Sequence, residues 1–174
     1  MSLFVSFMAM AGMLIRSATG ALFLGNGFAR VSDVAQSASG IAAWRLLPLD
    51  VAFPAARILT GVEILLGGWL LSGMNPLGAG IVAAFMFMFF AGAMAVNVLR
   101  GRTGLDCGCL PGADARISWY TVLRNIVLAV LVALSGFCNA ITSILLRIEG
   151  ACLGMTLLLL ALAVMHLSVR EVRE

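Results

Sequence analysis

The sequence predicts an all-α membrane protein, a polytopic chain with a four-helix antiparallel bundle core, a fifth transmembrane helix and a short interfacial helix. Of its 174 residues, 62% are apolar and 11% are charged, and the mean hydropathy is +1.09. Soluble domains carry roughly 25% charged residues. A second observation is a run of 36 residues, 64–99, without a single charge. Together they exclude a soluble globular domain and a disordered chain.

Five stretches are long and apolar enough to cross a bilayer, for which a helix needs about 20 residues. The run 64–99 is too long for one span, and Ser-Gly-Met-Asn-Pro at 72–76 divides it, with Pro76 expected as the first residue of the next helix. We expect one domain, 1–174, whose N-terminal stretch is a retained span rather than a signal peptide. The predicted spans are 11–30, 52–72, 77–99, 118–139 and 150–168.

Residues 31–50 mix polar and apolar side chains, which predicts a short amphipathic segment at the membrane interface. Trp44 and Arg45 are expected at the level of the headgroups, and Pro48 ends the segment. All eleven basic residues are arginines, and the formal net charge of +3 is small. This charge suits a lipid bilayer as partner and gives no reason to expect nucleic acid.

Arg16 and Glu63 are ionisable residues inside predicted spans, where each needs a partner or a function. Glu63 lies 12 residues after Val51, and Arg16 lies 14 residues before Arg30. If Val51 and Arg30 mark the same membrane face, Arg16 and Glu63 lie at the same depth. We therefore expect an Arg16–Glu63 pair that fixes helix packing. The alternative is that Arg16 extends to the interface while Glu63 is protonated and alone.

Asn97, Arg124 and Asn125 lie where the third and fourth spans approach the loop that joins them. Such side chains can hydrogen-bond across helices, so we expect them to hold helices together, with a direct role in a site as the alternative. Several small residues would allow helices to approach closely. They are Gly20, Gly27, Gly61, Gly67, Gly68, Gly92 and Ala93.

The loop 100–117 contains Cys107 and Cys109, separated only by Gly108. Their Cα atoms are at most about 7.3 Å apart, so a disulfide needs a bend at Gly108 and would be strained and easily reduced. Arg100, Arg102 and Arg116 favour the thiolate form, whereas Asp106 opposes it. Ser118 is expected to cap the next helix.

Three interpretations of this cysteine pair stay open. We favour a redox dithiol over a site for a soft metal such as Cu(I) or Zn, and we commit to no metal ligand. A purely structural pair is the third. Cys138 and Cys152 flank the turn between the last two spans, near the opposite face, and are read as ordinary apolar-site thiols. His166, the single histidine, is read as structural.

Several motifs together resemble a known family. The stretch 95–102, Ala-Val-Asn-Val-Leu-Arg-Gly-Arg, is followed by Asp-Cys-Gly-Cys at 106–109, the most specific part of the resemblance. Other matching pieces are Gly27-Phe28-Ala29-Arg30, Leu46-Leu47-Pro48, Glu63 with Gly67-Gly68, and Ser118 with Arg124-Asn125. Across roughly residues 14–135 the chain resembles the MauE family of methylamine-utilisation membrane proteins, which belongs with the DoxX-like proteins.

The resemblance implies a multi-pass protein of the cell inner membrane that is needed to mature methylamine dehydrogenase, whose small subunit is rich in disulfides. It implies a membrane-anchored thioredoxin-like partner. It also suggests likeness to the vitamin K epoxide reductase and DsbB type of bundle, with a quinone as the electron carrier. No other cofactor is expected.

These observations together predict thiol–disulfide exchange with a protein partner, in which one of Cys107 and Cys109 forms a mixed disulfide and the other resolves it. A non-catalytic membrane scaffold for assembly is the alternative, with a soft-metal-binding protein as a third.

The orientation in the membrane is open as well. The arginine-rich loops 31–50 and 100–117 share one side, which the positive-inside rule assigns to the cytoplasm, whereas maturation of a periplasmic enzyme requires the other side.

Overall fold

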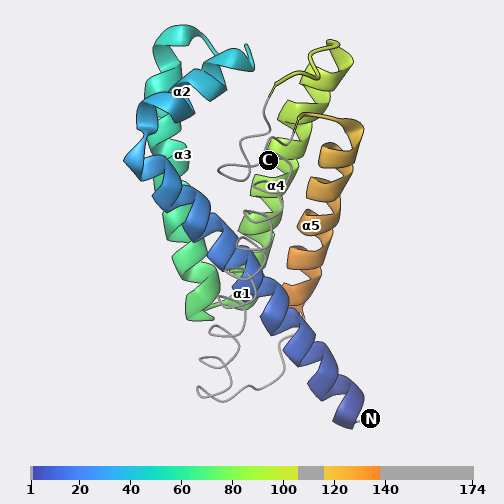
Figure 1. Ribbon diagram of the computed structural model, residues 1–174. Helices are drawn as coiled ribbons and strands as arrows, with labels where there is room; N and C mark the ends of the chain where they lie inside the picture. The colour runs from blue at the N-terminus through green and yellow to red at the C-terminus, as the bar shows by residue number, and fades with distance from the viewer. Residues whose placement is uncertain (1, 106–115, 138–174) are drawn as a thin grey trace, which may run out of the picture.

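The described part of the chain is a bundle of five helices (Figure 1). The computed structural model describes residues 2–105 and 116–137. Within them the helices are α1 (Ser2–Ser32), α2 (Val34–Ala43), α3 (Leu49–Ser72), α4 (Pro76–Leu99) and α5 (Trp119–Phe137). The all-α membrane architecture predicted from the sequence is confirmed.

Four of the five predicted spans fall on the long helices α1, α3, α4 and α5, and the fifth, 150–168, lies outside the described residues. Among the described helices, three are both long and apolar enough to cross a membrane. They comprise Phe7–Ser32, Pro76–Leu99 and Trp119–Phe137. Helix α3 is not among these three, and it carries Asp50, Arg57 and Glu63.

The turn between α3 and α4 forms where the sequence predicts it. Gly73 ends α3 with a left-handed backbone (φ 65°), which glycine adopts without steric cost. Asn75 caps α4, because its side-chain oxygen accepts a hydrogen bond from Gly78 N at 3.2 Å. Pro76 is the first residue of α4, where its missing N–H costs nothing.

Helix α2 is the short helix expected within 31–50. Asp33 caps it by accepting a hydrogen bond from Gln36 N at 2.8 Å, and the helix ends at Ala43. It packs against α3, which begins after Pro48. Helix α2 therefore separates the end of α1 from the start of α3.

The interior of the bundle is built largely from small side chains, and large apolar side chains face outward. Leu65, Phe85 and Leu99 are each more than 70% exposed. A soluble protein rarely leaves so much apolar surface open, whereas a bilayer covers it. Several alanines are almost completely buried where helices meet: Ala52, Ala56, Ala79, Ala83, Ala91 and Ala129. Small residues at helix contacts are typical of membrane bundles.

Glycines set the closest helix contacts. A Cβ on Gly67 of α3 would lie 2.8 Å from Gly20 O of α1, and a Cβ on Gly80 of α4 would lie 2.8 Å from Val132 O of α5. The expectation of close approach is confirmed at Gly20, Gly27 and Gly67. It is wrong at Gly61, Gly68 and Gly92, where an added Cβ would meet nothing within 4 Å.

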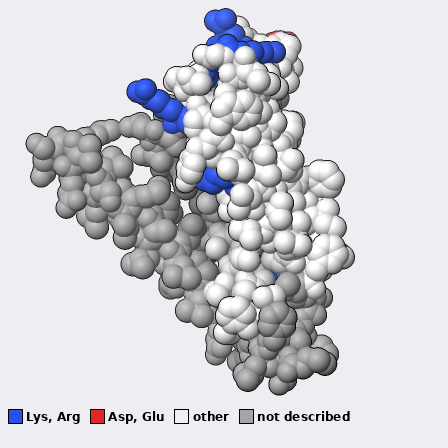
Figure 2. Space-filling view, turned by 90° about the vertical axis from the view of Figure 1, so that its right-hand side faces the viewer, with Lys and Arg blue, Asp and Glu red and all other residues white. Residues whose placement is uncertain are grey.

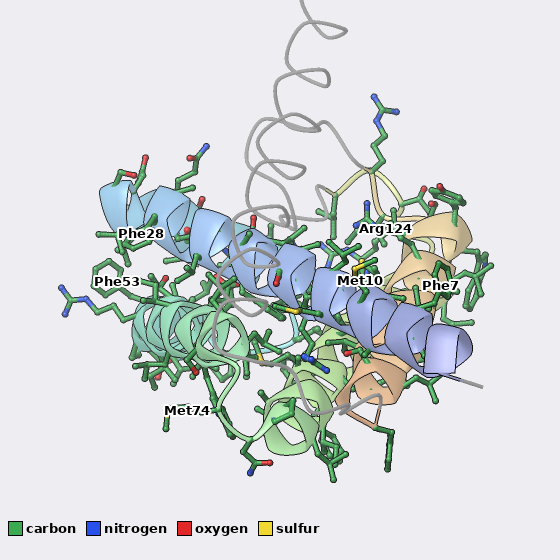
Figure 3. The ribbon with its side chains drawn as sticks, turned by 90° about the horizontal axis from the view of Figure 1, so that it is seen from below. Phe7, Met10, Phe28, Phe53, Met74 and Arg124 are labelled. Atoms are coloured by element: carbon green, nitrogen blue, oxygen red, sulfur yellow. The ribbon has the colours of Figure 1, made fainter. Side chains whose placement is uncertain are left out.

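Helix α1 joins two helix pairs. It packs against α3 and also against α5, which itself packs against α4. Seen from below, α1 crosses from the side of α3, where Phe28 and Phe53 lie, to the side of α5, where Phe7 lies (Figure 3). The four long helices thus form the core that the sequence predicts, tied together by one diagonal helix.

Candidate functional site

The two ends of the cysteine-containing loop meet at the end of the α4–α5 pair. Ile117 N donates a hydrogen bond to Leu105 O at 2.9 Å, which closes the base of the loop. Ile117 is 1% exposed and packs in a small apolar cluster with Ala91, Met94 and Val122. Asp106, Cys107, Gly108 and Cys109 lie outside the described residues, as do Cys138, Cys152 and His166. The structure thus fixes where this loop starts and ends.

Helix α4 leads into this loop through a C-terminal capping motif. Gly101 adopts a left-handed backbone (φ 70°), so that Gly101 N donates to Val98 O and Arg102 N donates to Asn97 O, each at 2.9 Å. This pair of hydrogen bonds is the Schellman motif, which gives hydrogen-bond partners to carbonyl groups that otherwise lack them at a helix end. Gly101 therefore determines where α4 stops and the loop begins.

Helix α5 leaves the loop through a reciprocal cap. Thr121 N donates to Ser118 Oγ at 3.4 Å, and Ser118 N donates to Thr121 Oγ1 at 2.9 Å. The two bonds satisfy orphan backbone donors at the start of the helix, as a capping box does. The predicted capping role of Ser118 is confirmed.

Asn97 and Asn125 are both buried beneath the loop, at 0% and 1% exposure. Each amide nitrogen donates within its own helix, from Asn97 to Ala93 O at 3.0 Å and from Asn125 to Thr121 O at 2.8 Å. The sequence predicts hydrogen bonds between helices, but both amide nitrogens donate within their own helix. Asn97 Oδ1 is buried without a hydrogen-bond partner. Arg124 is half-buried and lies on the side of α5 (Figure 3).

The expected Arg16–Glu63 pair is wrong, because Glu63 pairs with Arg30. Arg30 Nη1 lies 3.5 Å from Glu63 Oε1, and the two side chains are 15% and 1% exposed. The second carboxylate oxygen, Oε2, is buried without a hydrogen-bond partner. The buried carboxylate does have a basic partner, as the sequence predicts, but that partner is 14 residues, almost four helical turns, further along α1 than Arg16.

The register of α1 against α3 explains this correction. Glycine contacts place Gly20 against Gly67 and Gly27 against Ile64, next to Glu63. Arg16 is then about 16 Å, three helical turns, away from Glu63 along the bundle. The depth estimate assumed that Arg30 and Val51 are level. They are not, because the first turns of α3 pack against α2.

Arg16 instead connects α1 to α5. Its Nη1 donates a hydrogen bond to Ser135 O, and Arg16 is 9% exposed. Ser135 lies in the last turn of α5, where backbone carbonyls lack helical partners and a cation is favoured. The two arginines of α1 thus serve different neighbours.

The arginine-rich segments that the sequence places on one side are joined by contacts that the sequence does not predict. Arg100 Nη1 lies 3.4 Å from Arg45 O, and Arg102 Nη1 lies 3.3 Å from Trp44 O. Both contacts join the end of α4 to the corner after α2. Figure 2 shows the arginine surface of one face gathered toward this end. Only the three-dimensional fold brings residues 55 and 58 positions apart together.

Within residues 2–105 and 116–137, no group of three or more His, Cys, Asp or Glu side chains could hold a metal ion.

Comparison with known proteins now decides the family. The family model for "Methylamine utilisation protein MauE" matches residues 8–138, which include four of the five helices in full. The chain belongs to this family. The match covers the loop with Cys107 and Cys109 as well as Glu63, Asn97 and Asn125. The resemblance predicted from the sequence motifs is therefore confirmed.

Curated MauE proteins resemble the chain over parts of their length. Methylamine utilization protein MauE of Paracoccus denitrificans is 35% identical over 111 residues, 63% of this chain and 60% of the relative. That of Methylophilus methylotrophus is 42% identical over 91 residues, 51% of this chain and 48% of the relative. The chain thus spans about half to three-fifths of the length of these relatives. No solved structure matches it.

Proposed function

We propose that this chain serves methylamine utilisation as a thiol–disulfide exchange protein of the cell inner membrane. Cys107 and Cys109 are the exchanging pair, and a membrane-anchored thioredoxin-like protein is the partner. The exchange matures methylamine dehydrogenase, through its small subunit, or a related enzyme. Membership of the MauE family supports the pathway, and the Cys-Gly-Cys sequence supports the chemistry.

The observation that carries this proposal is the closed base of the loop. Cys107 follows Leu105 by two residues, so the two Cα atoms cannot be more than about 7 Å apart. Leu105 is bonded to Ile117 at the end of the α4–α5 pair. Bilayer-spanning helices end in the interfacial region, where a water-soluble domain can reach them. This geometry favours a cysteine pair that a partner domain can approach.

The residues around the loop base have supporting roles in the proposal. Arg100 and Arg102 add positive charge within a few residues of Cys107, which favours the thiolate that attacks a disulfide. The negative charge of Asp106 opposes the thiolate form, and Gly108 allows the backbone bend that a disulfide between the two cysteines needs. Arg124 and the buried amides of Asn97 and Asn125 underlie the same end of the bundle. We assign them to holding the loop base.

The proposed exchange has two balanced steps. The thiolate of one cysteine attacks the partner's disulfide, which forms a mixed disulfide and releases one partner thiolate. The second cysteine then attacks the mixed disulfide, which closes the Cys107–Cys109 bond and releases the other partner thiolate. Two electrons pass to the partner in this direction. The same steps run in reverse when the chain begins with its pair oxidised.

Cysteine substitutions test the proposal. We expect Cys107→Ser and Cys109→Ser each to abolish maturation of the target enzyme, and one of them to accumulate a mixed disulfide with the partner, seen as a reducible adduct on a non-reducing gel. Cys138→Ser and Cys152→Ser are the matched controls and should keep full maturation.

Other outcomes of the same experiment would contradict the proposal. Full maturation with the double variant Cys107→Ser/Cys109→Ser would favour a non-catalytic assembly scaffold. Bound metal in stoichiometric amount, lost in the same variant, would favour a soft-metal protein.

A further inference from the structure

At the basic end of the bundle, the side chains of Arg100 and Arg102 reach the backbone of Trp44 and Arg45. Arg100 and Arg102 follow α4, and their guanidinium groups contact the carbonyl oxygens of Arg45 and Trp44. Those carbonyls follow directly after α2, where a helix end presents partial negative charge. The contacts draw the positive side chains of one loop onto the backbone of another basic residue. They therefore concentrate positive charge at one place.

This concentration of charge has no acidic counterpart in the described structure. Among residues 2–105 and 116–137, the one ion pair within 4 Å joins Arg30 and Glu63, neither of which belongs to this cluster. Arg45 follows the C-cap of α2 and adopts the left-handed backbone (φ 49°) that often ends a helix, with Arg45 N donating to Ala42 O at 3.0 Å. Positive charges gathered at one place without an acidic partner indicate a site completed by an anion.

The surroundings identify the kind of anion. Exposed leucines border the arginines on both segments: Leu46, Leu47 and Leu49 after Arg45, and Leu99 before Arg100. Trp119 and Tyr120, 57% and 75% exposed, lie at the start of α5 at the same end. Aromatic residues are enriched at the headgroup level of membranes, and exposed leucines need hydrocarbon beside them. The arginines thus lie at the boundary between acyl chains and headgroups.

We propose that Arg45, Arg100 and Arg102 form a binding site for the phosphate of an anionic phospholipid headgroup. The guanidinium group is planar and donates several hydrogen bonds to phosphate oxygens, and basic pockets between membrane helices bind anionic lipids. The bound lipid bridges the end of α4 and the corner after α2. An acidic protein surface would have to cover the exposed leucines as well. The site shares Arg100 and Arg102 with the proposed thiol exchange, but lipid binding does not require that exchange to occur.

Lipid selectivity of the detergent-solubilised full chain tests this site. In native mass spectrometry, we expect phosphatidylglycerol to stay bound in preference to phosphatidylcholine. Arg100→Gln and Arg102→Gln should each weaken phosphatidylglycerol binding about fivefold, and the double variant should lose the preference. The matched control is Arg57→Gln, because Arg57 is an exposed arginine that packs 4.9 Å over the Phe53 ring and contacts neither carbonyl.

Three results would overturn the lipid site. One is no preference for phosphatidylglycerol, which would leave the cluster to an acidic protein surface. Another is an equal loss of phosphatidylglycerol binding in Arg57→Gln, which would show that only the net charge of the protein matters. The third is equal competition by millimolar inorganic phosphate, which would make this a site for free phosphate.

A second measurement needs no variant. Phosphatidylglycerol with a photoreactive headgroup should label peptides that contain residues 44–49 and 99–105 of the unmodified chain. Labelling elsewhere alone would contradict the site even if the glutamine variants failed to fold.

Discussion

Polar residues inside this bundle make two kinds of contact. Uncharged side chains bond to their own helix: Thr60 donates to Ala56 O at 2.8 Å, and Asn97 and Asn125 do the same four residues back. Charged side chains reach other helices, Arg30 to Glu63 of α3 and Arg16 to Ser135 O of α5. The charged residues of α1 therefore carry its specific contacts with both neighbours.

The Arg30–Glu63 pair predicts an asymmetric response to substitution. Arg30→Gln leaves a carboxylate at 1% exposure without its cation and should lower the free energy of unfolding by about 3 kcal/mol. Glu63→Gln should cost about 1 kcal/mol, because Arg30 is near the end of α1 and can extend to the interface. Thermal unfolding in detergent, followed by tryptophan fluorescence, measures both.

The double variant provides the control for this pair. Arg30→Gln/Glu63→Gln removes both charges and should be more stable than Arg30→Gln alone. Additive losses in this cycle would contradict a coupled pair, and non-additive losses in the corresponding Arg16→Gln/Glu63→Gln cycle would restore the discarded Arg16 pairing.

At the scale of elements, two neighbouring glycines of α3 should respond oppositely to alanine. A Cβ on Gly67 would lie 2.8 Å from Gly20 O and 2.9 Å from Leu24 N, both backbone atoms that cannot move aside easily. Gly67→Ala should therefore destabilise the α1–α3 contact by about 1–3 kcal/mol. Gly68→Ala meets nothing within 4 Å and should stabilise the helix by about 0.5–1 kcal/mol. Unfolding temperatures of both variants compare the two sites, and equal responses would contradict this helix contact.

The sequence predicts the elements well because their signals are local. Turn and capping chemistry within a few residues determines three of these features. They are the turn at 72–76, the cap at Ser118 and the amphipathic segment before Pro48. The pairing of Arg16 failed because helix register depends on contacts between distant residues, here Gly20 with Gly67. Counting residues from each membrane face cannot reveal that α2 packs against α3, so that the end of α1 is not level with the start of α3.

At the scale of the whole molecule, the candidate site was predicted in part. Sequence spacing selected the loop, Asn97 and Asn125, because polar residues stand out in apolar spans. The contacts of Arg100 and Arg102 with the corner after α2 could not be foreseen, because nothing in either segment specifies the other. Those contacts bring the expected loop and the expected interfacial segment to one end of the bundle.

The bundle predicts that the two ends of α4 face opposite sides of the membrane. Met74, 68% exposed, precedes α4, and the exposed Gly104 follows it, with about 36 Å of helix between them. In a background with all four cysteines changed to serine, Met74→Cys and Gly104→Cys should react with an impermeant maleimide from opposite sides, in intact spheroplasts and in inverted vesicles. Gly104 suits this probe because an added Cβ meets nothing within 4 Å.

The side on which Gly104→Cys reacts also separates the two proposals. Arginines around this end favour the cytoplasm, whereas exchange with an exported enzyme requires the outer side. A cytoplasmic position would contradict that exchange and leave the lipid site intact, since phospholipid headgroups line both faces. Reaction of both probes from one side would instead show that α4 does not cross, which contradicts the antiparallel bundle itself.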